Sequence, residues 1–146
     1  SATLGELAQA AVLAFDLPIS VTGFHFEGLE PAHPAFRHVE TLYDLASRAG
    51  VELFAGMRNP PGDAPAEYLR PEPRLRWLTI ETDASVELGH AIAFLNRVAE
   101  AAGSSAALPA RGADAHRAIS RGELASLVMR AAAHRQAQLL GTSLAA

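Results

Sequence analysis

The sequence predicts an α+β or α/β fold, with a small mixed sheet of at least three strands and helices packed on its faces. Three segments, residues 19–27, 51–57 and 74–81, have the β-branched and aromatic content of strands and are bounded by turn-forming residues. Apolar residues at helical spacing precede, separate and follow these segments. A chain of 146 residues is also long enough to enclose one hydrophobic core.

The amino-acid composition excludes several kinds of catalytic and metal-binding site. Hydrophobic residues make up 49% and charged residues 19%, which is the balance of a folded domain rather than of a disordered tail. The sequence has no cysteine, which excludes disulfides, thiolate zinc sites and thiol catalysis. All twelve basic residues are arginine, so a lysine Schiff base and a phosphate-loop lysine are also excluded.

Charge and hydropathy constrain the partners. A net charge of −4 argues against direct contact with nucleic acid, because phosphate binding needs a basic face. No apolar run approaches the roughly 18 residues of a membrane span. The first residues also lack the positive region of a signal peptide. We therefore expect a cytoplasmic domain without membrane contact.

The chain opens with a helix followed by a strand. Thr3 and Glu6 have the spacing of a capping box, and the helix that they open is predicted to end near Phe15. Residues 19–27 then form a strand with two partly apolar faces, as expected of a strand covered on both sides.

A second helix and strand follow. Pro34 suits the first turn of a helix that ends at Gly50, directly before the strand at residues 51–57. A strand, a helix and a strand with short joints form a right-handed crossover, so the two strands are predicted to be parallel. Residues 58–73 hold five prolines and are predicted to be a long irregular loop.

The third strand, residues 74–81, and the segment behind it form the centre of the predicted core. Apolar residues recur at helical spacing over residues 88–102, which favours a helix with Asp83 as its N-cap. A short buried strand within residues 86–98 is the alternative, because periodicity does not exclude it.

The C-terminal part is predicted to be a separate helical element. Ser120 and Glu123 form a second capping box, and Gly141 is the predicted end of the helix. The chain is thus divided into a domain of residues 1–112 and a helical extension of residues 113–146, which we expect to mediate a homo-oligomer. The residues predicted to face inward are Leu124, Leu127, Val128, Ala131 and Leu139.

Three histidines are candidates for a metal site. His25 ends the first strand, His33 lies in the next loop and His38 lies on the following helix, close to Glu40. Imidazole and carboxylate groups suit zinc, iron or manganese. The spacing of His33 and His38 matches no standard ligand motif, so surface, capping and half-buried roles remain the competing interpretation.

Asp83, Glu87 and His90 lie together at the head of the central segment. Asp83 or His90 would complete a metal site formed by the three histidines. Acidic residues at the start of a helix also complement its dipole, and that structural role already accounts for Asp83 and Glu87. His90, three residues after Glu87, is predicted to pair with it on the surface.

A second candidate site lies at the end of the proline-rich loop. Tyr68 and Trp77, with Arg70, Arg74 and Arg76, have the chemistry to stack on and clamp a planar or anionic ligand. The competing interpretation places Trp77 in the core and leaves the arginines to solvate an edge strand.

The order of these features resembles that of the DICT-type sensory domain over about residues 3–97. This resemblance implies a domain that senses a signal in bacterial transcription regulators and diguanylate cyclases, and it implies a strand rather than a helix after Asp83. The segments that carry it are VTGFHFE at 21–27, LYDLA at 42–46, VELFAG at 51–56 and PRLRWLTIETD at 73–83.

The sequence therefore predicts a regulatory or sensory domain of a bacterial signalling protein, which binds a small molecule or a partner rather than catalysing a reaction. Two alternatives stay open. One is a small metal-dependent enzyme that uses His25, His33 and His38. The other is a protein interaction module that uses the apolar stripe of the last helix. The sequence does not identify a cofactor.

Overall fold

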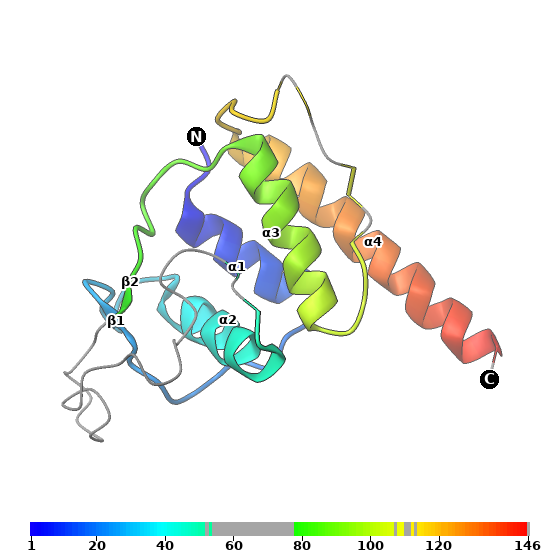
Figure 1. Cartoon of the computed structure of the whole chain (residues 1–146), viewed down its shortest axis with the longest axis horizontal. Helices are drawn as coiled ribbons and strands as arrows, with labels where there is room; N and C mark the ends of the chain where they lie inside the picture. Colours follow the sequence, from blue (N-terminus) through cyan, green and yellow to red (C-terminus); the bar gives the residue numbers. More distant parts are fainter. Residues whose placement is uncertain (52, 54–77, 107, 110–111, 113, 146) are drawn as a thin grey trace.

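The computed structural model describes residues 1–51, 53, 78–106, 108–109, 112 and 114–145. Within these residues the fold is a bundle of four helices (Figure 1). Two strands of two residues each, β1 (Phe26–Glu27) and β2 (Leu78–Thr79), pair in parallel, with Phe26 opposite Leu78. The helices are α1 (Leu4–Ala14), α2 (Phe36–Ala49), α3 (Leu88–Ala101) and α4 (Arg121–Ala145).

The predicted sheet of at least three strands is wrong for the described part of the chain, which is mainly helical. Of residues 19–27, only the last two pair as a strand. Ile19 and Val21 are 46% and 85% exposed, so this segment is not an interior strand. Its backbone groups are bound by side chains of α2 instead of by a neighbouring strand. Most of residues 51–57 and 74–81 lies outside the described residues.

Helix α1 is the central element of the bundle, since it packs against α2, α3 and α4. The predicted capping box at its start is confirmed. The N–H of Glu6 donates to the Thr3 hydroxyl at 3.2 Å, and the N–H of Thr3 donates to the Glu6 carboxylate at 3.0 Å. Gly5 lets this end approach its neighbours closely, because a Cβ there would lie 3.1 Å from the Thr82 carbonyl oxygen.

Helix α3 confirms the helical prediction for the central segment and corrects its start. The helix begins at Leu88, so Asp83 is not its N-cap, and the strand that the family resemblance implies after Asp83 is not present. Glu87 occupies the cap position without a side-chain hydrogen bond. The free amides of the first turn are bound by distant backbone: the N–H of Leu88 donates to the Arg117 carbonyl at 2.8 Å, and that of Gly89 to the Ala115 carbonyl at 2.9 Å.

The segments that lead into α1, α3 and α4 join one another through backbone hydrogen bonds. Ala2 donates to Ile119, Ile119 donates to Val86 and Val86 donates to Ala2, at 2.8 to 3.0 Å. We call this set of residues, with Thr3 and Ser85, the helix-start junction. It brings the beginnings of three helices to one end of the bundle (Figure 1).

Helix α4 begins as predicted but ends later. Its capping box is confirmed, since the N–H of Glu123 donates to the Ser120 hydroxyl at 3.1 Å and the N–H of Ser120 donates to the Glu123 carboxylate at 3.2 Å. The helix continues through Gly141 to Ala145 and extends beyond the other helices (Figure 1).

The two halves of α4 differ in burial. Leu124, Leu127 and Ala131 are buried in the common core, and α4 packs against α1 and α3. Leu139 is 47% exposed and Leu140 is 61% exposed, so the predicted inward position of Leu139 is wrong. Among the described residues, no helix has both the length and the apolar composition needed to cross a bilayer.

Candidate functional site

A buried carboxylate marks the candidate site. Among the described residues, Glu40 on α2 is the only buried charged side chain, with 1% of it exposed. One of its oxygens accepts from the backbone N–H of His25 at 2.8 Å, and the other contacts Nδ1 of the same histidine at 2.7 Å. Because a buried charge is costly unless it is paired and hydrogen-bonded, this arrangement stabilises one specific position of His25.

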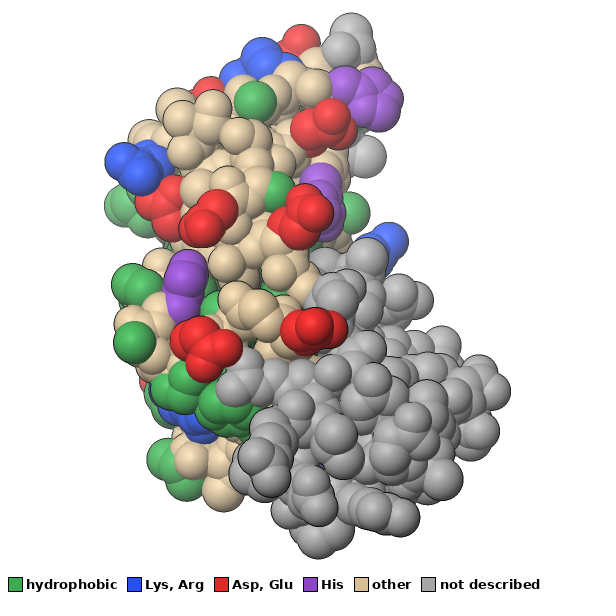
Figure 2. All heavy atoms as spheres, turned by 90° about the vertical axis from the view of Figure 1, so that its left-hand side faces the viewer, with side chains coloured by type: hydrophobic (Ala, Val, Ile, Leu, Met, Phe, Trp, Pro, Cys, Tyr) green, Lys and Arg blue, Asp and Glu red, His purple; other side chains and the backbone are tan. Residues whose placement is uncertain are grey.

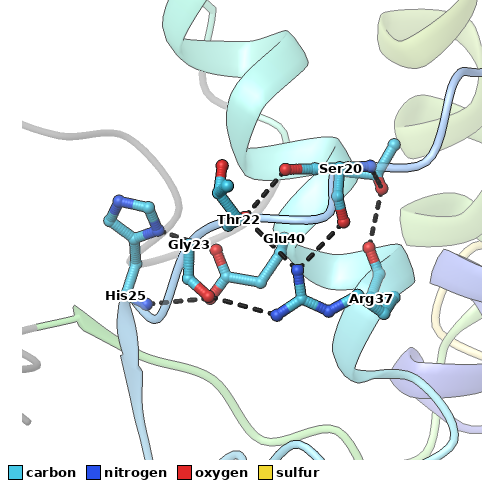
Figure 3. Close-up of polar contacts among 7 residues, drawn as sticks. Ser20, Thr22, Gly23, His25, Arg37 and Glu40 are labelled. Atoms are coloured by element: carbon cyan, nitrogen blue, oxygen red, sulfur yellow. Dashed lines mark hydrogen bonds and ion pairs between the residues drawn. The ribbon is translucent and has the colours of Figure 1, made fainter. Parts of the chain in front are cut away.

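Two further side chains of α2 hold the segment that precedes His25. The Arg37 guanidinium donates to the carbonyls of Ser20 and Gly23 at 2.9 and 3.2 Å (Figure 3). The hydroxyl of Thr41 accepts from the Ser20 N–H at 2.9 Å and donates to the Arg37 carbonyl at 2.7 Å. We call residues 19–25 the anchored loop, because side chains of one helix bind its backbone groups.

Gly23 lets the anchored loop pass over Glu40. Its φ of +111° lies in a region that side chains with a Cβ disfavour. A Cβ at this position would also lie 2.6 Å from Oε2 of Glu40, which is too close. The loop and the carboxylate therefore fit together only when residue 23 is glycine (Figure 3).

The imidazole of His25 is fixed on one side and open on the other. Its ring stacks on Tyr43, with centroids 3.9 Å apart and planes inclined by 27°. The side chain is 35% exposed. An ionised carboxylate only accepts hydrogen bonds, so the tautomer that suits an ionised Glu40 carries its proton on Nδ1 and leaves Nε2 as an acceptor. This is the arrangement of an oriented base or of a ligand-binding histidine.

The other two histidines of the predicted metal site have separate partners. Nδ1 of His33 accepts from the Ala35 N–H at 3.0 Å, and its Nε2 faces the Thr82 hydroxyl at 3.4 Å and Asp83 at 3.6 Å. Both ring nitrogens of His33 are thus engaged near the start of α2. Nδ1 of His38 lies 3.2 Å from the Pro34 carbonyl.

The histidine cluster is not assembled as a metal centre within the described residues. No group of three or more histidine, aspartate or glutamate side chains is placed there to hold a metal ion. His90 is exposed, and Glu87 contacts His116 at 3.3 Å rather than the predicted His90.

The second predicted site lies outside the described residues, since all of its members fall within residues 54–77. These are Tyr68, Arg70, Arg74, Arg76 and Trp77.

The distribution of charged side chains among the described residues can be followed on one face of the molecule (Figure 2). On the face shown in Figure 2, acidic side chains are spread over the described surface and basic ones lie toward its edges. On this face the described residues form no continuous basic patch.

Sequence reasoning identified His25 and Glu40 but missed the residues that hold them. Arg37 and Thr41 stand three before and one after Glu40, so all three lie on one side of α2, beside its apolar stripe. That polar stripe was the available signal. The role of Gly23 depends on a contact with another element, and no local pattern reports it.

Comparison with protein-family models, with curated proteins and with solved structures finds no match for this chain.

Proposed function

We propose that this chain is a regulatory domain that binds a small molecule at His25 and acts through that binding rather than through catalysis. The observation that carries the proposal is the buried Glu40 carboxylate, whose two oxygens both contact His25. A fixed, partly exposed imidazole suits recognition, because little side-chain entropy remains to be lost when a ligand binds.

The chemistry of His25 indicates the class of ligand. With Nδ1–H directed at Glu40, Nε2 of the neutral ring accepts a hydrogen bond, so the ligand offers an O–H or N–H donor. The stacked pair of His25 and Tyr43 favours a flat ligand beside the ring. A sensory role in the cytoplasm, and kinship with the DICT-type domain, belong to the same proposal.

The proposal is tested by nuclear magnetic resonance titration with small phenols, alcohols and aromatic amines. We expect at least one compound to shift the amide signals of Gly23 and His25 in a saturable way. The His25→Ala variant should lose this response, whereas His38→Ala should keep it, because His38 lies on α2 with a different partner, the Pro34 carbonyl. If every binding compound affects the wild type and His25→Ala equally, His25 is not the ligand contact.

A metal is the competing ligand, because a carboxylate behind an imidazole is also typical of metal-binding histidines. Addition of zinc to protein without an affinity tag separates the two possibilities. A metal bound at His25 predicts a rise in melting temperature that His25→Ala abolishes and that His38→Ala leaves unchanged.

A homo-oligomer formed by the outer part of α4 is a second proposal. It is supported by the exposure of Leu139 and Leu140, and of Met129 nearer the bundle. Light scattering on the wild type and on a Leu139→Glu/Leu140→Glu variant tests it. We expect a dimer that the double substitution converts to a monomer without loss of helicity, and a monomeric wild type would refute the proposal.

A further inference from the structure

A second site is indicated by a hollow on the bundle, away from the helix-start junction. The hollow measures about 350 Å³ and lies where α1 and α3 end, beside the second half of α2. Helix α4 contributes Arg135 to its lining. This volume is at the small end of the range for small-molecule sites, which is about 300–1,000 Å³.

Polar and apolar groups contribute about equally to the wall of the hollow. Phe15, at the end of α1, is buried, and Leu17 and Leu45 pack against the core beside it. The end of α3 contributes the small side chains of Ala101 and of its C-cap residue, Ala102. The hydroxyl of Thr41 also lines the hollow, but it already donates one hydrogen bond and accepts another. The part of the wall formed by Phe15, Leu17 and Leu45 therefore suits an apolar group.

The charged residues that line the hollow include one guanidinium without a carboxylate partner in the described part of the chain. Two arginines, Arg48 and Arg135, and one carboxylate, Asp16, line it. Arg48 is already paired with Asp44 at 3.0 Å. Arg135 is half-buried and has no ion-pair or hydrogen-bond partner among the described residues.

We propose that this hollow binds a small amphiphilic monocarboxylate, with its apolar body against Phe15 and Leu45 and its carboxylate on Arg135. A guanidinium binds a carboxylate through two parallel hydrogen bonds, which a half-buried position strengthens. One unpaired guanidinium matches a monoanion better than a phosphate with two negative charges. The apolar part of the wall favours a ligand that has an apolar body in addition to its carboxylate.

This inference goes beyond the function proposed for His25, because the two sites share no ligand-contacting residue. Thr41 lies between them: it lines the hollow and also binds the Ser20 N–H of the anchored loop. A ligand in the hollow would therefore be reported by the Ser20 amide signal even when His25 takes no part in binding.

The test is calorimetric and magnetic resonance titration with octanoate, acetate and 1-octanol as probes. Octanoate combines the charge with the apolar body, whereas acetate lacks the body and octanol lacks the charge. We expect saturable binding of octanoate, with acetate and octanol at least about tenfold weaker, because each loses one of the two contributions.

Variants locate the site. Arg135→Gln should weaken octanoate binding about tenfold by removing a charged hydrogen-bond donor. Arg130→Gln is the matched control, since Arg130 is exposed on the same helix and does not line the hollow, and it should bind as the wild type does. Ala101→Leu places extra volume into the hollow and should reduce binding further, with helicity checked by circular dichroism.

Three results would each overturn the proposal: no saturable octanoate binding by the folded wild type, equal binding of octanol and octanoate, or equal affinities of Arg135→Gln and Arg130→Gln. His25→Ala should keep the octanoate affinity of the wild type. Loss of binding in that variant would also count against the hollow, because it would place octanoate at His25.

Discussion

The helix-start junction and the anchored loop are held by two different kinds of contact. At the junction, backbone groups of three segments bind one another, so Ala2, Val86 and Ile119 need only the correct backbone path and an apolar side chain. In the anchored loop, the backbone of Ser20, Gly23 and His25 is bound by side chains of α2. The first arrangement should therefore accept other apolar side chains that fit the same buried space, whereas the second depends on specific polar side chains.

Among substitutions in these two regions, Glu40→Ala is expected to lower the stability of the fold most. We expect the free energy of unfolding to fall by about 2–3 kcal/mol, because the His25 N–H loses its acceptor and buried volume is left empty. Urea denaturation followed by circular dichroism measures the loss. Glu87→Ala is the control, since its contact with His116 is exposed, and a change within about 0.5 kcal/mol is expected. Equal losses would show that Glu40 does not anchor the loop.

Substitution of Gly23 separates steric contact from backbone conformation. Gly23 and Gly28 both have positive φ, at +111° and +80°, but only Gly23 has Glu40 within reach of an added Cβ. We expect Gly28→Ala to cost about 1 kcal/mol from its backbone conformation alone, and Gly23→Ala to cost about 2 kcal/mol or more. The same denaturation experiment measures both. Similar costs would mean that the loop moves away from Glu40 without penalty.

Substitutions at the helix-start junction should lower the stability of the fold only where the replaced side chain itself makes a hydrogen bond. Thr3→Ala removes the hydroxyl of the capping box and should cost about 1 kcal/mol. Ser85 pairs with Thr3 through backbone alone and is exposed, so Ser85→Ala should change stability by less than about 0.5 kcal/mol. A larger loss for Ser85→Ala would show that the junction also depends on side chains.

The same distinction explains which features the sequence predicts. Both capping boxes were predicted correctly, because a cap depends on residues three positions apart in the chain. Asp83 was wrongly predicted as a cap, because the first amides of α3 are bound by carbonyls of Ala115 and Arg117, which no local pattern reveals.

The anchored loop shows the limit of pattern reading more clearly. Residues 19–27 have the composition of a strand, yet Arg37 and Thr41 bind the backbone groups that a neighbouring strand would bind. His25 and Glu40 were both noted from the sequence as candidates, but their pairing and the need for Gly23 depend on how the loop lies across α2.

The smallest expected effect concerns the acid dependence of the two capping boxes. Burial raises the pKa of Glu6, but hydrogen bonds from Thr3 and Arg121 outweigh it, so the pKa lies below its ordinary value of 4.5. Hydrogen bonds from Arg117 and Ser120 likewise lower the pKa of Glu123.

A carboxyl group whose pKa is lower in the folded protein stabilises the fold at pH values above its unfolded pKa, and this contribution is lost as the pH falls through the folded value. The wild type should therefore lose more stability than a Glu6→Gln/Glu123→Gln variant as the pH is lowered from about 5 to 3, the range around the ordinary carboxyl pKa. Denaturation curves at several pH values measure this difference. Parallel losses in the two proteins would mean that ionisation of Glu6 and Glu123 adds nothing to stability, and that the hydroxyl caps and the backbone contacts of the junction hold the helix starts.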